Sequence, residues 1–285
     1  FWIQASPYFV VFAAMPLGLD GNFYTKVLPL VLIESVFFAY AFTSDLRTCQ
    51  VVIGLLGLWW CFAALWVEVK LEHTYPGFQY DAPQDPEMKA YRPFCDFAPW
   101  ATCSKVLMSP PGRFLRHFGI AKPLTATPGE VSLLDKARWL IDVPNPTIGV
   151  LFFGCHLFYP ALLLIPIITP LMPWLFYAAC VVVGLMTVWL AYNLIFVLSD
   201  CCVVCVSMYV ANFALIPMMH GICLTHKLSL NDYPDFFGAV PSSVLQPFLL
   251  LDTVMGIAVL SLWLFGGGTA HAREACYEKM GVDSA

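Results

Sequence analysis

The sequence predicts an all-α integral membrane protein that crosses the bilayer several times. Of its 285 residues, 60% are hydrophobic and only 12% are charged, and the mean hydropathy is +0.75. Soluble domains carry about a quarter charged residues, and a chain this apolar cannot cover its surface with polar groups in water. The net charge of −5 and the lack of a basic stripe argue against nucleic acid as a partner.

Six apolar segments have roughly the length that crosses a bilayer. They cover residues 28–43, 51–69, 147–168, 173–198, 202–224 and 248–265. The opening stretch, residues 8–19, is also apolar but is interrupted by Pro16 and Gly18. The tight connections at 168–173 and 198–202 require antiparallel neighbours, so the third, fourth and fifth helices are expected to pack up, down and up.

Residues 70–144 form a long polar segment that holds nine of the fourteen basic residues and is long enough to cap one end of the bundle. Its amphipathic piece at 133–141 suits a membrane surface. Short loops on the other side carry Arg47 and the pair His226–Lys227, which the positive-inside rule assigns to the cytosolic or stromal face. The cap is then expected on the lumenal face.

Eleven cysteines is a high number. Four lie inside apolar runs and are expected to be small buried hydrophobic side chains: Cys61, Cys155, Cys180 and Cys223. Two pairs differ from these. Cys202 and Cys205 form a C-x-x-C at the start of an apolar helix, and Cys95 and Cys103 lie eight residues apart in the long polar segment.

The C-x-x-C places two sulfurs on one turn of a helix, within reach of each other. Free N–H groups at a helix N-terminus favour a reactive thiolate, whereas apolar surroundings disfavour the anion. The alternatives are two inert buried thiols or a zinc site. The spacing of Cys95 and Cys103 does not match a zinc ribbon, so no metal site is expected.

The loop pair also has two interpretations. Cys95 and Cys103 form either a fixed structural disulfide in an oxidising compartment or a mobile pair. The expected topology places them on the same membrane face as Cys202. A mobile pair there can exchange with the helix pair by thiolate attack through a mixed disulfide.

These residues, with several further motifs, resemble the vitamin K epoxide reductase family. The matching motifs are Cys95-Asp96, Cys103-Ser104-Lys105-Val106, Asn145-Pro146-Thr147-Ile148-Gly149, residues 188–192, residues 196–205, Tyr209 and Asn212. The resemblance covers about residues 51–224 and implies one catalytic unit of four transmembrane helices. Cys201, an extra thiol beside the C-x-x-C, and Ser199, in place of an aromatic residue, depart from the family pattern.

The resemblance implies a role for each cysteine of the two pairs. Cys202 and Cys205 are the expected active-site pair, with Cys205 facing a quinone ring and Cys202 exchanging with Cys103. Cys95 and Cys103 relay electrons from an external thiol partner. The chain has no second C-x-x-C, so a separate thioredoxin-like protein is the implied partner.

Asn145 and Tyr209 are expected, by the same resemblance, to hydrogen-bond the quinone oxygens. A helix cap is the alternative role for Asn145, and an interfacial aromatic is the alternative for Tyr209. The quinone is a cofactor of phylloquinone, plastoquinone, ubiquinone or menaquinone type, and the sequence leaves that choice open.

The expected organisation has three parts: a flanking transmembrane region at 1–50, a catalytic core at 51–224 with its cap loop at 70–144, and a flanking helix and tail at 225–285. Glu34 and Asp252 lie within the flanking helices. Carboxylates inside a membrane usually face protein or water, which favours hydrogen bonds between helices over a proton-transfer role.

The leading hypothesis is a quinone-dependent thiol–disulfide oxidoreductase of the thylakoid or endoplasmic reticulum membrane, with its cysteine loop on the lumenal side. The alternative is an accessory or scaffold subunit of a larger photosynthetic or respiratory complex, for which flanking helices are suited. Scattered polar residues argue against a transporter, and no facing histidine pair supports haem.

Overall fold

The computed structural model describes residues 19, 21, 23–74, 93–121, 132–165, 169–225, 229–233 and 235–265. Within these residues the regular elements are helices, and the only strand-like feature is one bridge between Ala98 and Ala101. The all-α prediction is confirmed. The opening apolar stretch before residue 19, the His226–Lys227 pair and the C-terminal tail lie outside the described residues.

Five helices in the described residues are long and apolar enough to cross a membrane. They are α2 (Leu28–Thr43, extended at its start by the π-turn η1, Phe23–Val27), α3 (Leu46–Thr74), α9 (Met172–Tyr192, extended by the π-turn η4, Asn193–Val197), α10 (Val203–Leu224) and α11 (Ser242–Phe265). Helices suit a bilayer because each satisfies its own backbone hydrogen bonds. The chain is a multi-pass membrane protein.

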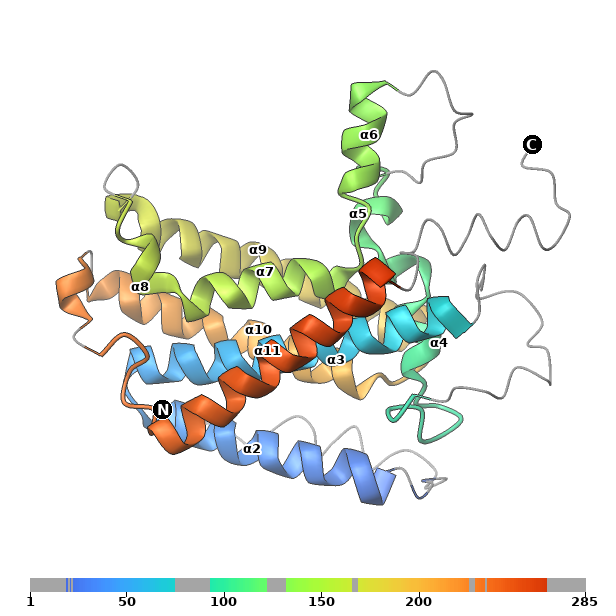
Figure 1. Cartoon of the computed structure of the whole chain (residues 1–285), viewed down its shortest axis with the longest axis horizontal. Helices are drawn as coiled ribbons and strands as arrows, with labels where there is room; N and C mark the ends of the chain where they lie inside the picture. Colours follow the sequence, from blue (N-terminus) through green and yellow to red (C-terminus); the bar gives the residue numbers. More distant parts are fainter. Residues whose placement is uncertain are drawn as a thin grey trace, which may run out of the picture.

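Helix α3 is the axis of the bundle, with α2, α7, α10 and α11 packed along it (Figure 1). In its most apolar window 83% of α3 is buried, against 17% for α2 and 11% for α11. Gly57 lets α3 and α7 (Asn145–Leu157) pack closely, because a side chain at this position would overlap the Phe153 ring of α7. The poorly buried outer helices therefore present apolar surface to lipid.

The predicted span at 147–168 is wrong as a single helix. Helix α7 ends at Leu157 and a short helix α8 (Tyr159–Leu162) follows, with the break at Phe158. Pro160 causes the break, because it has no N–H to donate to the carbonyl of His156, four residues earlier. Consecutive packing is confirmed for α9 on α10, but α7 packs along α3 and meets α9 mainly through the His156 and Phe176 rings.

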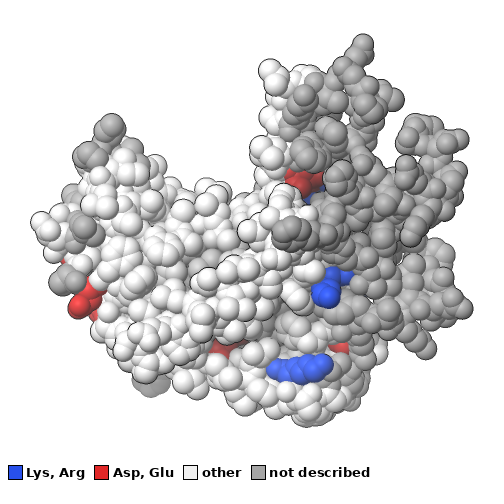
Figure 2. Space-filling view, in the orientation of Figure 1, with Lys and Arg blue, Asp and Glu red and all other residues white. Residues whose placement is uncertain are grey.

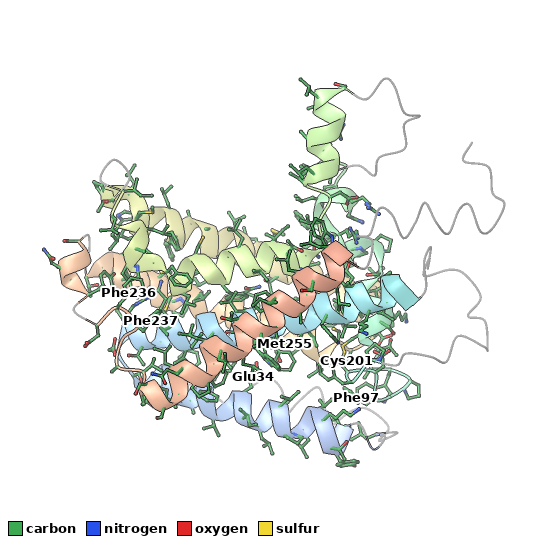
Figure 3. All side chains as sticks on the ribbon, viewed as in Figure 1. Glu34, Phe97, Cys201, Phe236, Phe237 and Met255 are labelled. Carbon is green, nitrogen blue, oxygen red and sulfur yellow. A yellow bond between two sulfur atoms is a disulfide. The ribbon has the colours of Figure 1, made fainter. Side chains whose placement is uncertain are left out.

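Arg47 satisfies the carbonyls that this break leaves open. Its Nη1 donates to His156 O at 3.0 Å, its Nη2 to Leu157 O at 2.6 Å, and its Nε to Phe236 O at 2.8 Å. The side chain is 4% exposed, so Arg47 joins α3, α7 and the loop before α11 as a buried strut. Figure 3 shows Phe236 at the end of the bundle opposite Phe97 and Cys201.

The two carboxylates of the flanking helices behave differently. Glu34 of α2 accepts a hydrogen bond from the Ser207 hydroxyl of α10 at 2.8 Å, which confirms the helix-to-helix interpretation. Asp252 of α11 is also buried, but neither of its oxygens has a hydrogen-bond partner among the described residues.

In Figure 2 the described surface over the middle of the bundle is almost free of charged side chains, as a lipid-facing surface requires.

Replacing Arg47 by Met is expected to destabilise the bundle. The change removes the buried donors and leaves carbonyls unpaired at the end of α7, which costs on the order of 3 kcal/mol. The measurement is the midpoint of thermal unfolding in detergent. Lys26→Met, at an exposed position of η1, is the control, and equal unfolding midpoints for both variants would show that Arg47 does not stabilise the break between α7 and α8.

Candidate redox site

The cap begins with a short hairpin that holds the first cysteine pair. Cys95 and Cys103 are joined by a disulfide, and the N–H of Phe97 donates to Ala101 O to close the turn between them. Cys103 is the first residue of α4 (Cys103–Leu107). Asp96 fixes this start, because its carboxylate accepts from the N–H and hydroxyl of Ser104 at 3.1 and 2.5 Å.

The second pair lies at the N-terminus of α10. Cys202 has extended backbone angles and is the N-cap of the helix, and its sulfur accepts the backbone N–H of Cys205 at 3.3 Å. The chain reaches this position through a sharp turn in which Ser199 has a positive φ of 49°. A cap residue with a bound N–H is held in one orientation, so the Cys202 sulfur has a fixed place.

The fold brings the two pairs into contact. Cys202 Sγ lies 3.3 Å from Cys103 Sγ, although the residues are 99 positions apart, and both cysteines are fully buried. Cys103 is also bonded to Cys95, so the sulfurs of Cys95, Cys103 and Cys202 form a continuous row at the N-terminus of α10. Cys205, one helical turn further on, completes the predicted set.

Burial keeps the Cys202 thiol of the C-x-x-C uncharged. It raises the pKa of the Cys202 thiol well above its ordinary value, and neighbouring Cys205 and Asp96 raise it further, while the bound N–H of Cys205 acts in the opposite direction. Desolvation therefore outweighs the helix N-terminus. Burial likewise raises the pKa of Cys201 to about 12, with contributions from Cys202 and Asp200. Cys201 and Cys202 both rest as neutral thiols.

A carboxylate that the sequence reasoning missed, Asp200, links the cap to the start of α10. It accepts from the Thr102 N–H at 2.9 Å and the Thr102 hydroxyl at 2.6 Å, and it pairs with the Lys105 ammonium at 3.2 Å. The signal available in the sequence was a lone acidic residue two positions before Cys202, at the end of an apolar helix.

A small, partly open pocket lies beside Cys205. Cys205, Asn145 and Tyr209 all line it, so the structure brings together the three side chains that were predicted to face a quinone. The remaining lining is mostly apolar and comes from Val106, Leu107, Ser109, Pro111, Gly112, Pro146, Leu190, Asn193, Leu194, Leu198 and Met208. An apolar cavity with few polar groups is typical of a small-molecule site.

Asn145 has a structural role that the sequence did not reveal. Its Oδ1 accepts the N–H of Phe114 at 2.7 Å, and its Nδ2 donates to Pro111 O at 2.7 Å. The helix-cap alternative is wrong, since the N-cap of α7 is Pro144. Asn145 instead ties the cap to α7 at the edge of the pocket.

A buried ion pair anchors the same part of the cap to α3. Arg113 Nη2 lies 3.2 Å from Glu68 Oε1, and Arg113 Nη1 donates to Asp142 O at 3.2 Å. Asp142 also pairs with Arg116. The segment at 109–118 is therefore held independently of the cysteine hairpin.

Helix α6 (Leu133–Leu140), which covers the predicted amphipathic piece, projects away from the bundle in Figure 1.

The loop pair also forms the one group in the described residues with ligand atoms close enough for a metal ion. The ligand atoms of Cys95, Asp96 and Cys103 lie within 4.8 Å of one another. The two sulfurs are joined to each other, however, and both Asp96 oxygens accept from Ser104. These donors are already in use in the disulfide form.

Comparison with known families places these features in context. The model of the vitamin K epoxide reductase family matches residues 49–220. This range contains both cysteine pairs, Asn145 and Tyr209, and it leaves α2 and α11 outside.

Disulfide exchange at Cys202 is expected to accelerate with pH. The thiolate is the attacking species, and because burial holds the pKa of Cys202 well above its ordinary value, the thiolate fraction rises about tenfold for each pH unit below that pKa. The measurement follows Cys103–Cys202 bond formation in a Cys205→Ser variant from about pH 6.5 to 9. A rate that levels off near neutral pH would show that the helix N-terminus prevails.

Proposed function

Because the chain belongs to the vitamin K epoxide reductase family, and is thus a membrane thiol oxidoreductase, we propose that it couples the oxidation of protein thiols to the reduction of a membrane quinone. The single observation that carries the proposal is the 3.3 Å distance between Cys103 Sγ and Cys202 Sγ beside the Cys205 pocket. A scaffold protein has no need for two cysteine pairs in reacting positions.

The exchange between the pairs passes through one mixed disulfide. With Cys202–Cys205 oxidised, the Cys103 thiolate attacks Cys202, forms the Cys103–Cys202 bond and releases the Cys205 thiolate. The Cys95 thiolate then attacks Cys103, restores the Cys95–Cys103 bond and releases Cys202. Two electrons move from the loop to the helix pair. The structure corresponds to the end of this sequence, with the loop bonded and the helix pair free.

The pocket lining fits a quinone ring. Its walls are mainly apolar, and the residues with polar side chains that line it include Tyr209, Asn145 and Cys205. In the proposal, Tyr209 and Asn145 hold the ring oxygens and Cys205 faces the ring. A bound quinone supplies an acceptor for two electrons and two protons. The pocket walls come from α4, η2 (Pro110–Gly112), α7, α9, η4 and α10.

A thioredoxin-like protein is the proposed thiol partner, and it acts on the loop pair. Cys95 and Cys103 are fully buried, so the partner requires an arrangement in which the hairpin has moved away from α10. The proposal places the cap on the lumenal face of a thylakoid or endoplasmic reticulum membrane. The position of Arg47 at the opposite end of the bundle supports that orientation.

A trapped mixed disulfide tests the relay. In a Cys95→Ser variant Cys95 can no longer resolve the Cys103–Cys202 bond and only Cys205 can reverse it, so the bond is expected to accumulate after oxidation of the C-x-x-C. The measurement is peptide mapping with thiols alkylated before the membranes are solubilised. Cys49→Ser, in a buried free cysteine at the start of α3, is the matched control. Absence of the Cys103–Cys202 peptide from the Cys95→Ser variant would refute the relay.

Removing the Tyr209 hydroxyl is expected to weaken quinone binding. Tyr209→Phe keeps the ring and loses one hydrogen bond, which corresponds to a rise in KM of about five- to tenfold. The assay uses menadione as the acceptor. Tyr177→Phe, in α9 beside His220, is the control, and an unchanged KM for Tyr209→Phe would exclude the hydroxyl from quinone binding.

A further inference from the structure

Asp200 bonds the residue that precedes each of the two reacting cysteines. It lies two residues before Cys202, and its partner Thr102 immediately precedes Cys103. We infer that Asp200 is a positioning residue that holds the Cys103 sulfur against the Cys202 sulfur for disulfide exchange. The inference rests on the proposed function and assigns the geometry of its central step to one carboxylate.

The contacts of Asp200 reach both sides of the reacting pair. On the cap side, its two oxygens accept from the N–H and hydroxyl of Thr102 at 2.9 and 2.6 Å. On the helix side, its Oδ1 accepts the N–H of Cys201 at 2.9 Å. One rigid group therefore fixes the residue before Cys103 and the residue before Cys202.

Charge and burial make this link strong. Asp200 is 7% exposed, and the ammonium of Lys105 lies 3.2 Å from its Oδ2. Lys105 also donates to Leu198 O at 2.9 Å, on the chain that leads into the turn. Hydrogen bonds that involve a charged group are roughly twice as strong as neutral ones. The contacts of Asp200 with Thr102 and Lys105 all cross from the cap to the α10 side.

The other side-chain anchors between the cap and the bundle hold a different segment of the cap. Asn145 and the Arg113–Glu68 pair hold the segment at 109–118, which lies beyond α4. A further link beside Asp200 is the bond from the Cys201 N–H to Trp100 O at 2.8 Å. Disulfide exchange needs reacting atoms about 3–3.5 Å apart, and a displacement of about 1 Å costs roughly a hundredfold in rate.

Two variants separate the charge from the hydrogen bonds. Asp200→Asn keeps an oxygen for the two N–H donors but loses the ion pair with Lys105, whereas Asp200→Ala loses every contact. In a Cys205→Ser background, formation of the Cys103–Cys202 bond is expected to slow about tenfold with Asn and about a hundredfold with Ala. Asp45→Ala is the control, because Asp45 binds Thr48 in the same way at the opposite end of the bundle.

A second measurement distinguishes positioning from folding. In a Cys95→Ser, Cys103→Ser background, the oxidation of Cys202 and Cys205 by menadione reports on the pocket alone. Asp200→Asn is expected to leave that single turnover unchanged. If it slows this oxidation as much as it slows bond formation, Asp200 is merely structural and the inference fails.

The remaining outcomes are also decisive. Bond formation at an undiminished rate in Asp200→Ala would overturn the positioning role and leave the proposed relay standing. Failure of the Cys205→Ser protein to form the Cys103–Cys202 bond with Asp200 intact would instead refute the relay, and the positioning role with it.

Discussion

The contact between Cys103 Sγ and Cys202 Sγ, at 3.3 Å, is the constraint to which the rest of the structure is fitted. One sulfur is fixed because it caps α10, and the other because a disulfide and Asp96 shape the hairpin around it. Both elements lie against α3, whose burial on most sides makes it the support of the cap and of the bundle.

Burial keeps the Cys202 thiol neutral. Burial raises the pKa of Cys202 more than the helix N-terminus lowers it, so reactivity must come from proximity and orientation rather than from a standing thiolate. Such a site exchanges electrons with a partner sulfur already in contact and resists reagents from outside. The apolar pocket at Cys205 extends this buried environment to the proposed quinone position.

Apolar length and cysteine spacing were enough to predict most of the helices and to single out both cysteine pairs, because both are local properties of a sequence. Features that depend on partners far along the chain were not predictable. The break before Pro160 leaves backbone carbonyls unpaired, and Arg47, about 110 residues away, donates to them. Asp200 and the bonds of Asn145 to the cap became visible only when the loop and the helices came together. Helices α2 and α11, outside the family match, were predicted as spans, but nothing in their sequence indicated that Glu34 would meet Ser207.

The central claim is that electrons from the loop thiols reach a quinone through Cys103 and Cys202. The most direct measurement is anaerobic oxidation of the fully reduced protein in liposomes by menadione, with quinol and remaining thiols counted together. The proposed relay predicts one disulfide for each quinol, with wild type forming both the Cys202–Cys205 and Cys95–Cys103 bonds and Cys103→Ser forming only the first. Equal quinol yields from the two proteins, or quinol without disulfide, would contradict it.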